Sequence, residues 1–165
     1  MSIDEILAVA PTLAQLTAGT CRVWHVQLPP GLPLINANRR IHHMQRAKLT
    51  KVLRREGRKA VERARVPALE RAHIFGIFCP EDNGHRDVGN WYPSFKGFVD
   101  GVVDAGVLPD DDDTHLIGPD MRRGPVVPGG QLRLLIVQLP DLTPGPAPAG
   151  PGPHPIALPS GGRHG

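Results

Sequence analysis

Aromatic residues are scarce in this chain, at 4% of 165 residues, so its core must be built mainly from Val, Ile, Leu and Ala. The two cysteines, Cys21 and Cys79, are too few for a disulfide framework and are not spaced as a zinc knuckle. No run of 18 apolar residues exists that would span a membrane, and the N-terminus carries acids where a secretory signal has basic residues. The simplest interpretation is a reduced, cytoplasmic protein with no membrane segment.

The two ends of the chain lack the pattern of a folded domain. Residues 143–165 contain 7 Pro and 6 Gly, and such a segment buries too little apolar surface to offset the entropy lost on ordering. We therefore predict a disordered Pro/Gly-rich tail over 142–165, a loosely ordered N-terminal extension over 1–20, and one folded domain over 21–141.

Strand and helix patterns alternate through the predicted domain. Apolar periodicity and breaker residues predict helices at about 43–65 and 93–103 and strands at 22–28, 70–79, 115–117 and 132–139. The apolar run Ile-Phe-Gly-Ile-Phe at 74–78 is typical of a central strand that is covered on both faces. Together these patterns predict an α/β (α+β) domain with a small mixed sheet and two main helices, in the order β-α-β-α-β-β.

Charge is strongly polarised along the chain. Residues 39–71 hold 12 Lys/Arg against 3 Asp/Glu, whereas residues 81–113 hold 9 Asp/Glu against 2 Lys/Arg. The basic block would suit the phosphates of DNA. We expect the phosphate contacts to come from Arg39, Arg40, Arg46, Lys51, Arg54, Arg55 and Arg58. The alternative is that the basic helix and the acidic loop are solvated faces that pair with each other.

The acidic block contains the residues that carry chemistry. Four adjacent aspartates at 110–113 repel one another unless they are solvated or bound to a cation, and a site of oxygen ligands suits magnesium or manganese. Asp87 and Asp111 could converge on such a cation, with Lys96 in the helix between them. A solvated turn is the alternative for the four aspartates, and an ion pair with Asp100 is the alternative for Lys96. For Trp91 and Tyr92, core or dimer packing competes with stacking on DNA.

The ordered combination of R-D-x-x-N at 86–90, Lys96 four residues before Asp100-Gly101, and G-V-L-x-D-D at 106–111 resembles the RusA-type Holliday-junction resolvases. These are small endonucleases of bacteria, often within prophages and phages. The resemblance extends over about residues 22–139. It implies a mixed sheet with helices, a homodimer, and cleavage of branched DNA that depends on Mg²⁺, for which Mn²⁺ may substitute.

The resemblance also assigns roles to single residues. It implies catalytic roles for Asp87, Asp111 and Lys96, metal ligation by Asp87, Asp110, Asp111 and Asp112, and supporting roles for Arg86 and Asn90. The family usually has R-D-x-D-N, and Gly89 stands here in place of the second acid. In an extended segment this acid would point to the same side as Asp87, so we expect water, Asp82, Asp100 or another of the aspartates at 110–113 to take its ligand position. Alternatively, Gly89 serves a backbone conformation with positive φ.

The predicted function is a magnesium-dependent, structure-selective endonuclease that resolves Holliday junctions and other branched DNA in recombination and repair. One alternative is a non-catalytic protein that binds branched DNA through a site decayed at Gly89. Another is a protein that uses only the fold for an interaction in a phage or mobile element. We expect a homodimer, because two symmetric nicks need two identical sites. The apolar area of the second helix and of strand 132–139 also exceeds what one thin sheet needs.

Overall fold

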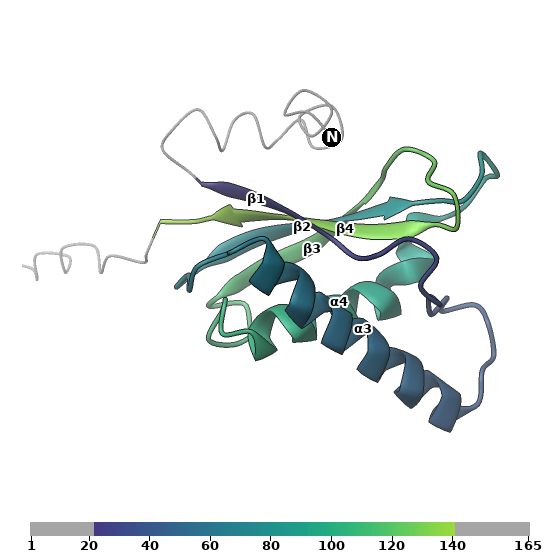
Figure 1. Ribbon diagram of the computed structural model, residues 1–165, viewed down its shortest axis with the longest axis horizontal. Helices are drawn as coiled ribbons and strands as arrows, with labels where there is room; N and C mark the ends of the chain where they lie inside the picture. The colour runs from purple at the N-terminus through teal and green to yellow at the C-terminus, as the bar shows by residue number, and fades with distance from the viewer. Residues whose placement is uncertain (1–21, 141–165) are drawn as a thin grey trace, which may run out of the picture.

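The computed structural model describes residues 22–140 and confirms an α+β domain with a mixed sheet (Figure 1). The predicted segments 1–20 and 142–165 lie outside the described residues. In chain order the elements are β1 (Val23–Gln27), α3 (His43–Arg63), β2 (Ala72–Cys79), the 3₁₀ helix η1 (Val88–Trp91), α4 (Tyr92–Asp104), β3 (Leu116–Arg123) and β4 (Gln131–Gln138). No helix in this part of the chain combines the length and the apolar character needed to cross a membrane.

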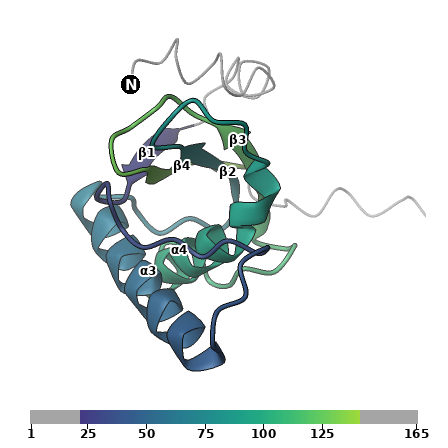
Figure 2. The same cartoon turned by 90° about the vertical axis from the view of Figure 1, so that its right-hand side faces the viewer.

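The four strands form one sheet in the order β1-β4-β2-β3. Strand β4 runs antiparallel to both β1 and β2, whereas β2 and β3 are parallel. Parallel strands need a long crossover, and α3 and α4 supply one each, after β1 and after β2. Both helices lie on the same face of the sheet, as the two perpendicular views show (Figures 1 and 2).

The central strand β2 is covered on both faces, as its apolar run predicts. Ile74 and Phe78 point to the helices and belong to the main core, together with Phe95 and Phe98 of α4. On the opposite face Phe75, Ile77, Cys79, Leu135 and Val137 form a second cluster with no exposed surface, against which Val127 packs. An eight-residue strand buried on both sides therefore anchors the segment that follows it, residues 80–91.

Local sequence accounts for the ends of the helices. The imidazole of His42 accepts a hydrogen bond from the Met44 amide at the start of α3, which satisfies one of the free amides of a helix N-terminus. Pro93 occupies the first turn of α4, where a missing amide proton costs nothing. Gly106, with φ of +73°, follows the end of α4 in the left-handed conformation that glycine favours.

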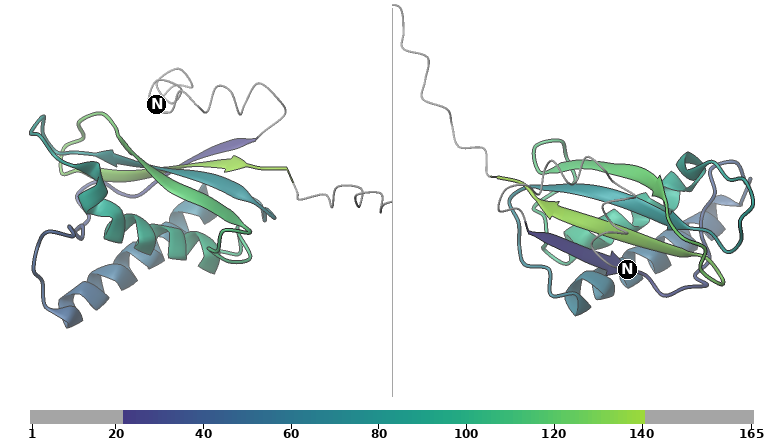
Figure 3. Two further views of the ribbon diagram at one scale, coloured as in Figure 1. Left: turned by 180° about the vertical axis from the view of Figure 1, so that it is seen from behind. Right: turned by 90° about the horizontal axis from the view of Figure 1, so that it is seen from above.

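Helices α3 and α4 approach each other most closely at glycines. A Cβ atom at Gly101 would lie 2.2 Å from the backbone oxygen of Arg54, and one at Gly57 would lie 2.8 Å from the backbone oxygen of Phe98. No side chain fits between the two backbones at these points. The crossing is visible from behind the molecule in the left view of Figure 3. It fixes the basic helix α3 against the helix that carries Lys96.

Strand β3 is longer than the sequence predicts. The pattern indicates a strand only at 115–117, but the structure has one at Leu116–Arg123. This strand lies at the edge of the sheet and pairs with β2 alone. An edge strand tolerates proline and polar residues such as Pro119 and Asp120, so it does not show the apolar alternation by which strands are recognised.

The apolar residues of α4 and β4 that were expected to form a dimer interface are buried within the protomer. Strand β4 lies inside the sheet, not at its edge, and Leu134, Leu135, Ile136 and Val137 have no exposed surface. On α4 the main apolar side chains are likewise buried. The packing argument for a homodimer was therefore wrong, and the expectation of a dimer depends on the symmetry of the substrate alone.

Candidate functional site

Asp87 stands at the junction between the loop after β2 and the 3₁₀ helix η1. Its backbone is extended, and its Oδ1 atom accepts a hydrogen bond from the Gly89 amide at 2.9 Å, which caps η1. The side chain is exposed. The cap fixes the direction of the carboxylate by a contact within its own loop, and the second oxygen has no hydrogen bond to the described residues.

The backbone at Gly89 adopts neither of the two conformations expected from the sequence, an extended segment or a positive φ. It lies within η1 and is not among the glycines with positive φ. Residues i and i+2 of a 3₁₀ helix do not share a side, because the helix turns by about 120° per residue. Even so, a Cβ atom at Gly89 would lie 3.3 Å from Oδ1 of Asp87. The side chain of an acid at this position would therefore start close to the Asp87 carboxylate. The reason is the turn of η1 and not the extended backbone that we expected.

Lys96 is held between two carboxylates that come from different segments. Its ammonium donates to Asp100, one turn further along α4, and to Asp111 in the loop that follows the helix. The ion pair with Asp100 is the alternative considered from the sequence, and the structure shows it. The contact with Asp111 spans 15 residues and brings one of the four adjacent aspartates back against α4.

Electrostatics within this group favour the charged forms. Partial burial lowers the pKa of Lys96, but its hydrogen bonds to Asp100 and Asp111 outweigh that effect, and the pKa is raised. The hydrogen bond from Lys96 lowers the pKa of Asp111, with a further contribution from the side chain of Asp110. Lys96 and Asp111 are thus both ionised at neutral pH, and the ammonium supplies the cation that two neighbouring carboxylates require.

The other aspartates of the run hold the turn. Oδ1 of Asp110 accepts from the Asp111 amide at 2.7 Å. Oδ1 of Asp112 accepts from the amides of Thr114 and His115 at 2.9 and 3.1 Å. These contacts agree with the solvated-turn alternative for Asp110 and Asp112, whereas Asp111 reaches another element.

The chemistry of these oxygen donors suits magnesium, but they are not gathered into one cluster. Among residues 22–140, no three side chains of His, Cys, Asp or Glu lie close enough together to hold one metal ion. Asp100 and Asp111 are a possible ligand pair, since both contact the ammonium of Lys96. A cation bound between these two hard carboxylates would share or replace the position of Lys96.

Arg86 and Asn90 brace the loop around Asp87. The Arg86 guanidinium makes two hydrogen bonds to Asp82, at 2.7 and 2.9 Å, and lies 3.5 Å from Glu81. Its hydrogen bonds to the Asp82 carboxylate raise the pKa of Arg86. The backbone oxygen of Asn90 accepts from the Ala37 amide at 2.7 Å and ties η1 to the segment before α3. The two supporting residues of the resemblance therefore act on loop geometry.

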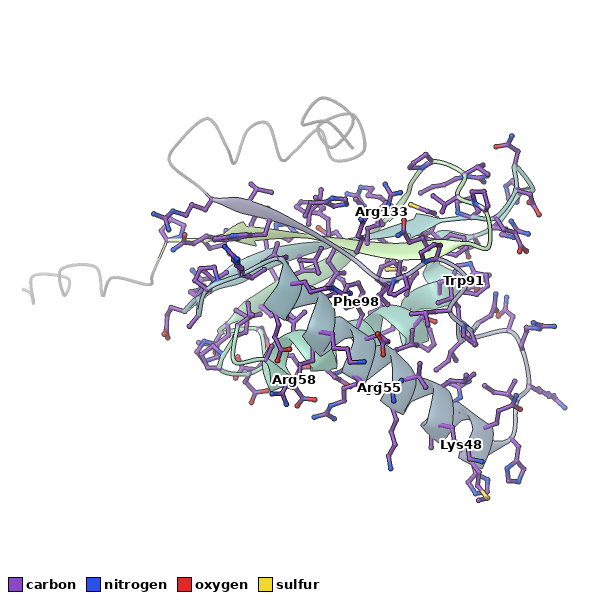
Figure 4. The ribbon with its side chains drawn as sticks, in the orientation of Figure 1. Lys48, Arg55, Arg58, Trp91, Phe98 and Arg133 are labelled. Atoms are coloured by element: carbon purple, nitrogen blue, oxygen red, sulfur yellow. The ribbon has the colours of Figure 1, made fainter. Side chains whose placement is uncertain are left out.

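The basic residues divide into two groups by their partners. Arg54 forms two hydrogen bonds to Asp104 of α4, Arg58 pairs with Glu62 at 2.8 Å, and Arg55 pairs with Glu56 at 3.1 Å. Lys48, Arg55 and Arg58 are labelled along α3 in Figure 4. Within the described part of the chain, no ion pair or side-chain hydrogen bond is formed by the exposed residues Arg39, Arg40, Arg46 and Lys51.

Two of these unpaired residues, Arg46 and Lys51, lie in the N-terminal part of α3, which projects from the rest of the domain. Residues 43–48 are exposed on every side of the helix, and the first fully buried side chain of α3 is Leu53. Figure 1 shows this end of α3 projecting away from the sheet. A projecting helix end with Arg46 and Lys51 presents unpaired cations to a polyanion, as the sequence predicts for the basic block.

The sequence placed Asp100 only as a substitute ligand or as the partner of Lys96, yet it is one of the two carboxylates at the centre of the group. Its i,i+4 spacing from Lys96 was the available signal.

Comparison of the chain with protein-family models and with curated proteins finds no match.

Proposed function

We propose that this protein is a metal-dependent endonuclease that binds branched DNA through α3 and the segment before it, and cuts it near Asp87, Lys96 and Asp111. The observation that carries the proposal is the contact of Lys96 with Asp100 and Asp111, which brings an ammonium and two carboxylates together from α4 and the loop after it. The residues of the RusA-type resemblance, read from the sequence, support the same assignment.

Hydrolysis of a phosphodiester needs a water that attacks phosphorus while the P–O3′ bond breaks. The departing 3′ oxygen takes a proton, and the products are a 5′-phosphate and a 3′-hydroxyl. The positive charge of Lys96 would stabilise the negative charge that grows on the phosphoryl oxygens in the transition state. Asp100 and Asp111, which both contact Lys96, are the pair of oxygen donors that would hold Mg²⁺ or Mn²⁺, and only the resemblance assigns Asp87 as a further ligand. A bound ion would lower the pKa of water and neutralise the phosphate.

DNA binding in this proposal relies on charge and not on base readout. Arg39, Arg40, Arg46 and Lys51 have no carboxylate partner among residues 22–140, so contact with a phosphate breaks no ion pair. Arg54, Arg55 and Arg58 would first have to exchange a carboxylate for a phosphate. We propose a homodimer as the active form, because a four-way junction with two-fold symmetry requires two equivalent sites for two symmetric nicks.

The decisive experiment is cleavage of a synthetic four-way junction by the full chain, with and without Mg²⁺. We expect cutting only with the metal. Asp87→Asn and Asp111→Asn should each abolish cutting while junction binding persists, because each removes a ligand charge and keeps the side-chain volume. Glu70→Gln, an exposed carboxylate outside the site, is the matched control and should cut normally. Wild-type rates for both site variants would refute the assignment.

A non-catalytic DNA-binding protein is the second candidate. Two observations favour it: Gly89 offers no carboxylate, and Lys96 already neutralises Asp111. In that case the junction is bound with the same salt sensitivity, but no strand is cut at any Mg²⁺ or Mn²⁺ concentration. Absence of DNA binding would instead favour the third alternative, an interaction role for the fold alone.

A further inference from the structure

A pocket of about 320 Å³ opens beside the 3₁₀ helix η1, which Asp87 caps. This volume is at the lower end of the range for small-molecule sites. Its apolar walls come from Leu32 and Leu34, in the segment after β1, and from Phe78 and Trp91. Gly129 and Gly130, in the turn before β4, complete the wall without contributing side chains. None of these six residues has a role in the site described above, although Arg39 and Arg86 also line the pocket.

The aromatic wall is already a stack of two rings. Trp91 lies parallel to Phe78, with ring centroids 4.6 Å apart and planes inclined by 16°. Phe78 is 3% exposed and belongs to the core, whereas Trp91 is only partly buried. Figure 4 shows Trp91, the last residue of η1, near one end of the sheet. An indole with a rigid aromatic backing suits a third flat ring, because bases stack on aromatic side chains without regard to sequence.

Charged groups at the pocket wall match the other parts of a nucleotide. Arg39 is exposed and has no ion pair within residues 22–140, so it is available for a phosphate. Glu81 is also exposed and lines the pocket. Its carboxylate can accept a hydrogen bond from the exocyclic amine of a base. Arg86, held by Asp82, adds a second positive charge.

We propose that this pocket binds one unpaired nucleotide of the DNA substrate, with its base against Trp91 and its phosphate at Arg39. A paired base cannot enter, since a base inside a duplex has both faces stacked on its neighbours. Branch points supply bases that are more easily unpaired. The proposal rests on the proposed function only in naming DNA as the source of the nucleotide.

The position of the pocket links it to the candidate site. Arg86 lines the pocket and Asp87 is the next residue, while η1 connects Asp87 to Trp91. A nucleotide held in the pocket would therefore direct the neighbouring phosphates of the same strand toward the loop of Asp87. Selection of a branched substrate would follow from the unpaired base, and the basic helix would supply affinity that is independent of structure.

The test measures nucleotide binding without metal and without cleavage. Calorimetric titration of the wild-type chain with dAMP is compared with 2-deoxyribose 5-phosphate, which lacks the base. We expect heat of binding from dAMP and at least tenfold weaker binding of the sugar phosphate. Arg39→Ala should weaken dAMP binding at least fivefold, whereas Lys48→Ala, an exposed cation on α3 outside the pocket, should leave it unchanged. Equal binding of the two ligands, or no effect of Arg39→Ala, would overturn the proposal.

Fluorescence reports the stacking itself. In a Trp24→Phe variant with an unchanged circular dichroism spectrum, Trp91 is the remaining tryptophan. Its emission should be quenched by dAMP and by a single-stranded oligonucleotide, but not by the same sequence as a duplex. If the variant does not fold, the calorimetric comparison decides alone. Junction cleavage without nucleotide binding would support the proposed nuclease and refute the nucleotide pocket. Nucleotide binding without cleavage would support the pocket and refute the nuclease.

Discussion

Replacing Gly101 by alanine tests the packing that places the basic helix against α4. Alanine normally stabilises the interior of a helix by about 1 kcal/mol relative to glycine. At Gly101, however, the new Cβ would lie 2.2 Å from the backbone oxygen of Arg54 and 2.8 Å from the backbone nitrogen of Arg58. The first distance is about 1.2 Å shorter than the 3.4 Å of ordinary contact. Because the obstacle is backbone, α3 and α4 must move apart.

The structure predicts a net loss of stability from this single methyl group. Overpacking of a core costs about 1–3 kcal/mol, and a contact with rigid backbone belongs at the upper end. After the helix-propensity gain, we expect Gly101→Ala to lower the free energy of unfolding by about 2 kcal/mol. With a urea dependence of about 1–3 kcal/mol per molar, the unfolding midpoint should fall by about 1 M.

Gly97→Ala on the same helix is the matched control. Its Cβ would lie 3.2 Å from the Cβ of Leu53 and 3.6 Å from the backbone oxygen of Thr50, so a shift of a few tenths of an ångström accommodates it. We expect its midpoint to stay within about 0.5 M of the wild type. Urea unfolding followed by circular dichroism measures both variants. If Gly101→Ala is as stable as the wild type, the close approach of the two helices is wrong.

Three further predictions concern charge and metal. Because the hydrogen bond from Arg54 lowers the pKa of Asp104, that pairing stabilises the fold above the unfolded value of about 3.9 and loses its effect as pH falls through the lower folded value. The unfolding midpoints of wild type and Asp104→Asn should therefore differ at pH 7 and converge below pH 4; a constant difference would contradict this. Gly89→Asp should let junction cleavage saturate at lower Mg²⁺, and unchanged metal dependence in a folded variant would show that no ligand was missing. The double change Arg46→Ala and Lys51→Ala should weaken all DNA forms alike and reduce the slope of log affinity against log salt by about 2; a loss confined to one DNA sequence would instead indicate base readout.

Only one contact of the candidate site could be predicted from the sequence. The spacing of Lys96 and Asp100 on one helix face allowed their ion pair to be predicted. Nothing in the spacing indicated that Asp111, of four adjacent aspartates, would be the one to reach Lys96. That choice depends on how the loop after α4 turns back. The extended geometry expected around Gly89 was wrong, because Asp87 caps a 3₁₀ helix at that point.

The sequence by itself determined the main helices and strands and their order. Helices and strands bury one face at periods of 3.6 and 2 residues, and the spacing of apolar residues in the sequence shows those periods. The helix from His43, the central strand at 74–78 and the helix begun by Pro93 all follow from such local patterns. Only the tertiary structure decided the strand order, the extent of the edge strand β3, the contact at Gly101 and the pocket beside Trp91. Each of these joins segments that are distant in the sequence, and a pairing across such distances depends on packing that no local period records.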